Sequence, residues 1–273
     1  MRLVDSHCHL QADRFDDDVD AVLASAREAG VERILVPGWN AWSSAAALAL
    51  AERVPWLDAA VGVHPHDAAG VDDAAWSAIA DSAAEPRVVA IGETGLDYDR
   101  VFSPILAQLA NLRRTLVLAA ETGKPAILHC RSTVGERDAQ DALLAELGAF
   151  GHDVPAVVIH SFSGPLDYAE AMLELGAAIS ISGLAFRKGE EATADVIRLV
   201  PADRLLVETD SPFLSPPGAP RGRNAPEWVR VTAAWVAQLR GNEPESAGDG
   251  LVAAYDRVFG ATRPVADKAA SGS

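Results

Sequence analysis

Two histidines separated by one residue, His7 and His9, follow a short apolar run at the start of the chain, and Asp5 precedes them. In a strand, alternate side chains share a face, so these three side chains would point the same way. Two imidazoles at this spacing can bind one divalent ion, and Asp5 could orient an imidazole through its second nitrogen. A lone His-x-His is weak evidence, so the weight of this pair depends on where the other histidines and acids lie.

Further residues of these types follow later apolar runs; they are His64, Glu93, His129, His160 and Asp210. Glu93, His129 and His160 are each separated by about 30 residues, which is the length of one βα unit. The carboxyl ends of the strands of a βα barrel gather at one rim, and that rim carries the active site. We therefore expect residues that are far apart in the sequence to converge there.

The elements that must position these residues alternate along the chain. Apolar runs alternate with amphipathic helical patterns, which predicts an α/β fold with a parallel sheet. Eight runs are present, the number of strands in a (β/α)8 TIM barrel; they cover residues 3–4, 33–37, 57–61, 88–91, 126–128, 156–159, 177–181 and 205–207. Helices are expected over 17–29, 103–122 and 136–147, with a last one over 251–259 on the outside. We expect Gly30, Gly123, Gly148 and Gly176 to end helices.

The length and composition agree with this fold. The 273 residues fit one barrel of ~250 residues, so we expect a single domain over 1–262 and a disordered tail over 263–273. The formal charge of −16 argues against a protein that coats duplex nucleic acid, but it leaves open an enzyme for strand ends or small anions.

The sequence also indicates where the protein works. It has no apolar run long enough to cross a bilayer and no secretory signal, so we expect a cytoplasmic protein without membrane association. No obligate protein partner is evident. Cys8 and Cys130 are expected to be small buried thiols rather than a disulfide or metal ligands.

Four histidines and two carboxylates exceed the roughly four ligands of one zinc ion, and they fit two divalent ions bridged by a carboxylate. We expect Glu93 to bridge the two ions. One ion would bind His7, His9, Glu93 and Asp210, and the other would bind Glu93, His129 and His160. A metal-activated hydroxide would then attack the substrate, and Asp210 could move a proton from water to the leaving group. Zinc, magnesium and manganese all remain open.

Several motifs in collinear order carry a resemblance to a known family; they are residues 5–10 (DSHCHL), 62–66 (GVHPH), 92–98 (GETGLDY), 129–131 (HCR), 160–164 (HSFSG), 208–214 (ETDSPFL) and 223–226 (RNAP). In these the chain resembles the TatD family of metal-dependent deoxyribonucleases, which are amidohydrolase-like barrels. The resemblance implies a dinuclear site on a TIM barrel and hydrolysis of DNA phosphodiesters, as a 3′→5′ exonuclease on DNA ends or short single strands. By position it implies the same six metal ligands.

The chain departs from the family pattern at several places, and the stretch after residue 99 lacks the family's usual glutamine–phenylalanine pattern. Thr94 stands where an aliphatic residue is usual, Ser161 where Cys or Ala is frequent, Ala225 where Glu is common, and Asp99 where a second tyrosine often follows Tyr98. These changes spare the ligands and leave the substrate open. The first alternative is therefore a dinuclear hydrolase of an aminoacyl ester, amide or lactone. The second, a non-enzymatic metal-binding scaffold, is disfavoured by the intact ligand set.

Three arginines, Arg131, Arg221 and Arg223, are candidates to bind phosphate, because a guanidinium fork matches phosphate oxygens. For Arg221, a solvated loop position is an equally good interpretation. His64 and His66 could hydrogen-bond the same phosphate.

Two more features have alternative interpretations. Trp39 and Trp42 could stack on a base, although packing at the rim is the favoured role. The acidic run 16–18 predicts the start of a helix, where negative charge is favourable, rather than a metal site.

Overall fold

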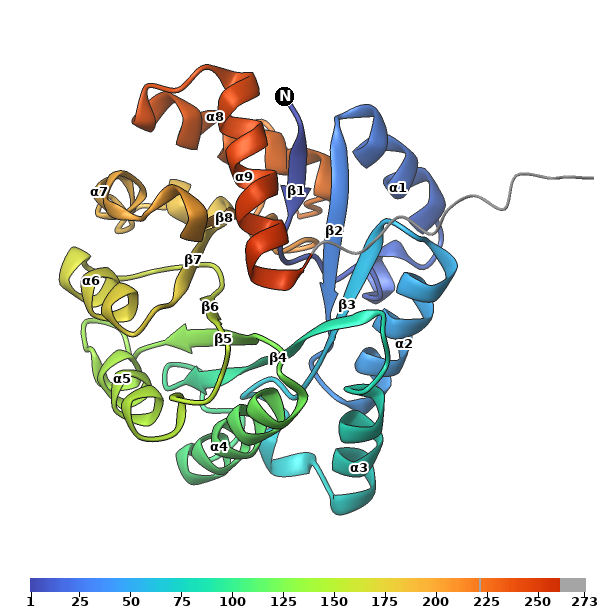
Figure 1. Ribbon diagram of the computed structural model, residues 1–273, viewed down its shortest axis with the longest axis vertical. Coiled ribbons are helices and arrows are strands. Elements are labelled where there is room, and N and C mark those ends of the chain that lie inside the picture. The colour runs from blue at the N-terminus through green and yellow to red at the C-terminus, as the bar shows by residue number, and fades with distance from the viewer. Residues whose placement is uncertain (221, 261–273) are drawn as a thin grey trace, which may run out of the picture.

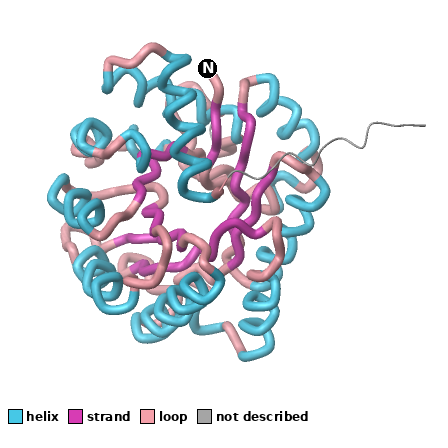
Figure 2. Tube along the Cα trace, viewed as in Figure 1, coloured by secondary structure: helices cyan, strands magenta, loops and turns pink. Residues whose placement is uncertain are grey.

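The computed structural model describes residues 1–220 and 222–260. Its eight parallel strands form one sheet in sequence order, and the helices surround this sheet (Figures 1 and 2). The strands are β1 (Leu3–Asp5), β2 (Val31–Pro37), β3 (Leu57–Val61), β4 (Val88–Asp97), β5 (Ala126–Arg131), β6 (Val157–Ile159), β7 (Ala178–Ile181) and β8 (Leu205–Val207). The predicted (β/α)8 TIM barrel is confirmed.

Helices follow every strand; they are α1 (Val19–Glu28), α2 (Ala41–Arg53), α3 (Asp73–Ser82), α4 (Ile105–Thr122), α5 (Asp138–Phe150), α6 (Leu166–Glu174), α7 (Thr193–Leu199), α8 (Val229–Arg240) and α9 (Pro244–Phe259). The helices cover the outer face of the sheet, so the strands are apolar on both faces, as in other parallel sheets. All five residues of β3 and all ten of β4 are buried.

Segments beyond the ends of β1 and β8 join these two strands into the ring. The backbone N–H of Ser6 donates to the Val207 carbonyl at 3.0 Å, and Cys8 forms an isolated parallel bridge with Ser211. The N–H of Asp210 donates to the carbonyl of His7 at 2.9 Å. The seam of the barrel is therefore also the place where two candidate ligands are held together.

Three sequence predictions about element bounds are wrong. The fourth strand continues to Asp97 instead of ending near residue 91, so Glu93 lies within a strand. Gly148 lies inside α5, which ends at Phe150. The last helix begins at Pro244, well before the predicted residue 251. The sequence pattern missed these first turns because Gly248 interrupts the apolar spacing. Glycine is needed there, since a Cβ would lie 2.4 Å from the Arg2 carbonyl oxygen.

Helix α9 lies against β1 and β8 at the end of the barrel where the strands begin (Figure 1). Among the described residues, no helix is both long and apolar enough to cross a bilayer. The predicted tail over 263–273 and the candidate Arg221 lie outside the described residues, so the domain boundary at 262 stays a prediction.

Candidate active site

Glu93, on β4, lies at the centre of a cluster of imidazoles, and its two carboxylate oxygens face different members of the cluster. Oε2 is 3.2 Å from Nε2 of His7 and 3.7 Å from Nε2 of His9. Both histidines come from the segment directly after β1. One oxygen of Glu93 therefore faces the histidines of the barrel seam.

The other oxygen of Glu93 faces three imidazoles, one on β5 and two from the segments that follow β3 and β6. Oε1 is 2.8 Å from Nε2 of His160, 3.2 Å from Nδ1 of His129 and 3.4 Å from Nε2 of His64. The Glu93 side chain therefore lies between the two groups of candidate ligands, as the sequence predicted. The glutamate is 2% exposed, so water cannot neutralise its charge.

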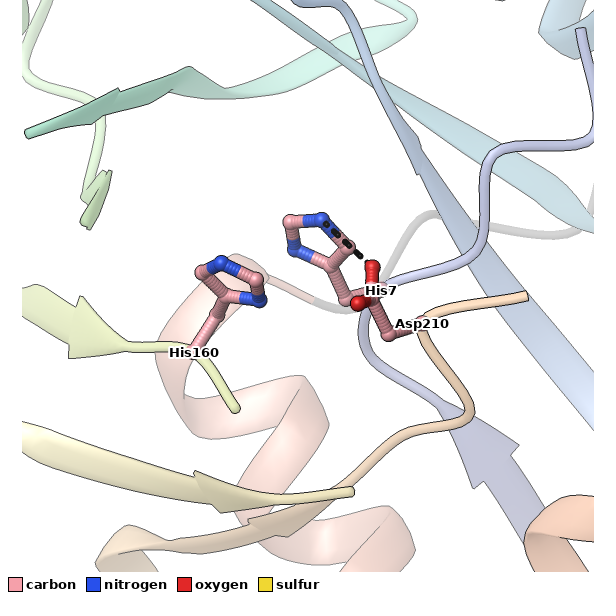
Figure 3. Close-up of side chains that lie close together, drawn as sticks. All are labelled: His7, His160 and Asp210. Atoms are coloured by element: carbon pink, nitrogen blue, oxygen red, sulfur yellow. Dashed lines mark ion pairs between the residues drawn. The ribbon is translucent and has the colours of Figure 1, made fainter. Parts of the chain in front are cut away.

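Asp210 closes the seam side of the cluster. Its Oδ1 lies 3.4 Å from Nε2 of His9 and 3.8 Å from Nε2 of His7. Figure 3 shows His7 between Asp210 and His160, whose ring stacks on that of His7 with 3.9 Å between centroids. Asp210 has a φ of 52°, and Ser161, next to His160, has a φ of 45°. Non-glycine residues in this conformation concentrate at functional sites.

A glycine allows the strands that carry Glu93 and His129 to come close. Gly95 has a φ of 135°, and a Cβ there would lie 2.0 Å from the carbonyl oxygen of His129. No side chain fits at that distance. Gly95 therefore allows the backbones of β4 and β5 to lie this close together.

Neighbouring groups, acting against the effect of burial, set the charges of the cluster. Burial would raise the pKa of Glu93, but the surrounding imidazoles, His160 first, hold it well below its ordinary value. Burial opposes ionisation of Asp210 too, yet the hydrogen bond with His9 lowers its pKa. For His160, burial would lower the pKa, but Glu93 and Glu208 raise it well above its ordinary value. Both carboxylates are therefore ionised at neutral pH, and the imidazolium proton is one that a cation would displace.

The donor set fits divalent cations. Nε2 of His7 and Nε2 of His9 are only 3.2 Å apart and face the same carboxylate, so a proton or a cation must lie between these lone pairs. Across residues 1–220 and 222–260, neither Glu93 nor Asp210 forms an ion pair with a lysine or arginine. In three groups of residues the possible ligand atoms all lie within 4.8 Å of one another; the groups are His7–His9–Glu93, His7–His160–Asp210 and His64–Glu93–His129.

His64 also lies in the cluster, but its hydrogen bonds favour a different role. Its Nδ1 accepts the backbone N–H of His66 at 3.1 Å, so in the neutral ring the proton is on Nε2. Burial lowers the pKa of His64 to about 4, which keeps the ring neutral. The nitrogen that faces Glu93 is therefore an N–H donor rather than a metal ligand.

Sequence reasoning missed two acids that hold the ligands. Glu208 Oε1 lies 3.2 Å from Nδ1 of His160 and accepts the N–H of Ser161 at 2.7 Å, which fixes the orientation of that ring. Asp97 Oδ2 lies 3.4 Å from Nε2 of His129 and 2.6 Å from Nε2 of His66. The alternation of side chains along a strand could have indicated Asp97, because residues 93 and 97 of one strand point to the same face.

Asp5, the acid expected to orient an imidazole, contacts none. Its carboxylate accepts the N–H of Thr209 at 2.9 Å, the Thr209 hydroxyl at 2.6 Å and the backbone N–H of His7 at 3.3 Å. The Nδ1 atoms of His7 and His9 find no hydrogen-bond partner within the described part of the chain. Asp5 therefore ties the end of β8 to the segment after β1.

The two described arginines predicted to bind phosphate are engaged by acids. Arg131 donates to Asp99 Oδ2 through Nε at 2.9 Å and lies at the rim, beyond His129 on β5. Arg223 pairs with Asp18, and its guanidinium lies over the ring of Phe15. The acidic run thus serves one ion pair and leads into α1, which begins at Val19.

Both cysteines are free thiols, as expected. Cys8 is fully buried, and burial raises the pKa of Cys130 to about 12. Neither belongs to a candidate metal group of the described residues.

Known proteins resemble this chain over almost its whole length. The family described as TatD related DNase matches residues 4–260. A 3′-5′ ssDNA/RNA exonuclease TatD from Erwinia billingiae is 39% identical over 255 residues, which cover 90% of this chain and 94% of that protein. An uncharacterized metal-dependent hydrolase, YabD from Bacillus subtilis, is 34% identical, with 87% and 91% of the two chains covered. The crystal structure of YJJV, a TatD homolog from Escherichia coli, has a TM-score of 0.86 and 32% identity, with 96% and 99% covered.

Proposed function

Because the chain belongs to the TatD-related DNase family and is a metal-dependent hydrolase, we propose that it cleaves phosphodiester bonds at the ends of single-stranded DNA or RNA. Cleavage would proceed in the 3′→5′ direction, as the name of the Erwinia relative says of that protein. We propose a cytoplasmic location on the ground that both cysteines are free thiols.

One observation carries the proposal: the two oxygens of Glu93 face two separate groups of imidazoles. His7, His9 and Asp210 would hold one divalent cation with Glu93, and His129 and His160 would hold a second one. Zinc, magnesium and manganese are candidates, since imidazoles favour zinc and carboxylates also accept the other two. When bound, such a pair lowers the pKa of water and neutralises charge on a phosphodiester.

The other side chains have distinct roles in the reaction. Asp210, ionised and at the edge of the cluster, would accept a proton from the attacking water and deliver it to the leaving oxygen. His64 would donate its Nε2–H to a phosphate oxygen, because its other nitrogen is occupied by a backbone N–H. Glu208 would hold His160 in its ligating orientation. His66 and Arg131 lie farther out and would contact the flanking phosphate.

A second candidate function is hydrolysis of an uncharged aminoacyl ester, amide or lactone. It is favoured by the ion pairs of Arg131 with Asp99 and of Arg223 with Asp18, which occupy both candidate phosphate binders. The net charge of −16 points the same way. The same constellation could attack a carbonyl carbon.

A turnover screen of metal-reconstituted protein separates the two functions. It compares a single strand labelled at its 5′ end, a duplex of the same sequence, a phosphomonoester and an aminoacyl ester. We expect a ladder of 5′-labelled products that shortens with time on the single strand. A protein that turns over only the ester would refute the nuclease proposal, and activity that persists in EDTA would refute the metal chemistry.

A further inference from the structure

On the basis of the proposed function, we infer that an aromatic wall beside His9, made of Trp39, Trp42 and Phe213, stacks on the unpaired terminal bases of the substrate. The wall would select single strands, because a base inside a duplex has no free face. It would be a specificity-determining surface and take no part in the chemistry.

The wall is continuous with the active site. The ring of Trp39 lies 5.3 Å from that of His9, and the ring of Phe213 lies 6.0 Å from it, both edge to face. Trp42 extends the wall outward, 6.2 Å from Trp39. Because His9 also approaches Glu93 and Asp210, a nucleotide whose phosphate reaches the cluster has its base beside these rings.

The wall exposes apolar surface that the fold does not cover. Trp42 is 65% exposed and Phe213 49% exposed, although both belong to segments that are otherwise well packed. Large exposed aromatic side chains next to a site indicate a binding surface. Stacking on a base is the role that fits a rim beside a phosphodiester site.

The segments that carry the wall are held in place. The side chain of Asn40 caps α2 by accepting the N–H of Ser43, and the Ser43 hydroxyl accepts the N–H of Trp39 at 2.8 Å. The Trp39 carbonyl accepts the N–H of His64 at 2.9 Å. Phe213 is backed by the guanidinium of Arg14, 5.7 Å from its centroid. A wall fixed in this way needs little ordering on binding.

The charge of the site also favours stacking as a source of affinity. The two described candidates for phosphate binding, Arg131 and Arg223, are paired with acids, and Arg14, behind Phe213, donates to the carbonyl of Gly222. The chain carries a net charge of −16, so phosphates gain little from long-range attraction. Stacking of a base on an aromatic ring needs no charged side chain and contributes about 1–3 kcal/mol per base.

The test compares variants on two strands in the metal-loaded enzyme: an ordinary oligonucleotide, and the same strand with abasic residues in its last two positions. Trp42→Ala and Phe213→Ala should each raise KM on the ordinary strand roughly 5- to 50-fold, the loss of one stacked base, with little change in kcat. On the abasic strand the same variants should match the wild type. Trp42→Phe should retain most of the affinity.

Phe150→Ala is the matched control, since Phe150 is 46% exposed but ends α5 at the other end of the barrel. Stopped-flow fluorescence of a strand with a terminal 2-aminopurine adds a readout of stacking before cleavage. Its quenching should weaken in Trp42→Ala and stay unchanged in Phe150→Ala.

Equal losses on both strands, unchanged KM and quenching in both wall variants, or the same loss in Phe150→Ala would overturn the inference. The inference would also be overturned if Trp42→Ala changed the oligomeric state while its KM equalled that of the wild type. That result would assign the wall to contact with a second copy of the chain. If the wild type quenches 2-aminopurine without cleaving the strand, the proposed function fails while stacking stands. If it cleaves the strand and the wall variants behave as wild type, only this inference fails.

Discussion

At the end of the barrel where the strands begin, Asp58 is fully buried and faces the guanidinium of Arg33 and the hydroxyl of Tyr255, which donates to it at 2.8 Å. At the opposite end, Glu93 is buried almost as deeply, but within residues 1–220 and 222–260 all of its ion-pair partners are imidazoles. The first carboxylate is neutralised by a permanent cation of the chain itself. The second is surrounded by groups that must either bind protons or offer lone pairs to a cation.

The difference separates a structural acid from a functional one. An arginine pair satisfies a buried carboxylate permanently, so that end of the barrel needs nothing further. An imidazole cluster neutralises the carboxylate only while the rings are protonated or hold a metal. Which of the two applies depends on pH and on the metal concentration. Burial alone would not have distinguished the two ends, whereas the type of partner does.

The largest expected effect comes from the imidazole end. Glu93→Gln replaces the carboxylate whose two oxygens face the two groups of histidines, so turnover should fall by more than about 10³-fold. Divalent metal should raise the melting temperature of the wild type and not that of the variant. Glu146→Gln is the control, because Glu146 is 9% exposed and pairs with Arg113; it should keep full turnover. Full activity in Glu93→Gln would show that Glu93 holds no metal.

The arginine end should respond in the opposite way. Arg33→Met leaves Asp58 buried without its cation, which should lower the unfolding free energy by about 3–5 kcal/mol. The kcat/KM per folded molecule should not change. Arg2→Met, which breaks an exposed pair with Glu32, should cost about 1 kcal/mol or less. Denaturant melts of the two variants make the comparison, and equal costs would contradict it.

The two ends should also differ in pH dependence. In the metal-free protein the carboxylates raise the pKa of His160 well above its ordinary value of 6.5, despite burial. Its protonated form therefore stabilises the fold fully below about pH 6.5, and this contribution is lost as pH rises through the raised pKa. A metal needs the free lone pair, so stabilisation by metal should grow over the same rise in pH.

Melting temperatures between pH 6 and 9, with and without metal, measure both trends. The cost of Arg33→Met should stay constant across this range, because a guanidinium does not titrate there. A metal-induced shift that is independent of pH would contradict this account of His160.

The smallest effect concerns an ion pair at the rim of the site. Asp99→Asn should release Arg131 for a phosphate, lower KM for an oligonucleotide about 2- to 5-fold and steepen its salt dependence by about 0.7 in log–log slope. KM for an uncharged ester should stay the same. Asp203→Asn, which breaks the pair with Arg257 near the start of β8, is the control. An unchanged salt slope would remove Arg131 from phosphate binding.

The sequence predicted the barrel and the convergence of the candidate ligands, because both follow from local patterns. Apolar runs located all eight strands, and each candidate ligand follows or lies within such a run, so the topology brings these side chains to one rim. The bounds were less predictable where a glycine had a tertiary reason. Gly248 fits against the Arg2 backbone and hid the first turns of α9. Gly148 is a different case: it lies inside α5 without ending it, and a Cβ there would meet no atom within 4 Å.

Pairing between side chains was beyond the reach of the sequence. Nothing local indicates that Arg131 meets Asp99 or that Arg223 meets Asp18, because the members of each pair are far apart in the sequence and meet only in the folded barrel. The same holds for Asp5, which contacts Thr209 rather than an imidazole. Glu208 is the instructive omission: it lies two residues before the candidate ligand Asp210, and its partner His160 follows a different strand, β6.

The most direct test of the central claim is anomalous diffraction from crystals of the protein loaded with manganese or zinc. We expect two anomalous peaks per chain, one contacting Glu93 Oε2 with His7 and His9, the other contacting Oε1 with His129 and His160. A single peak, or peaks that leave both oxygens of Glu93 without a metal, would contradict the account.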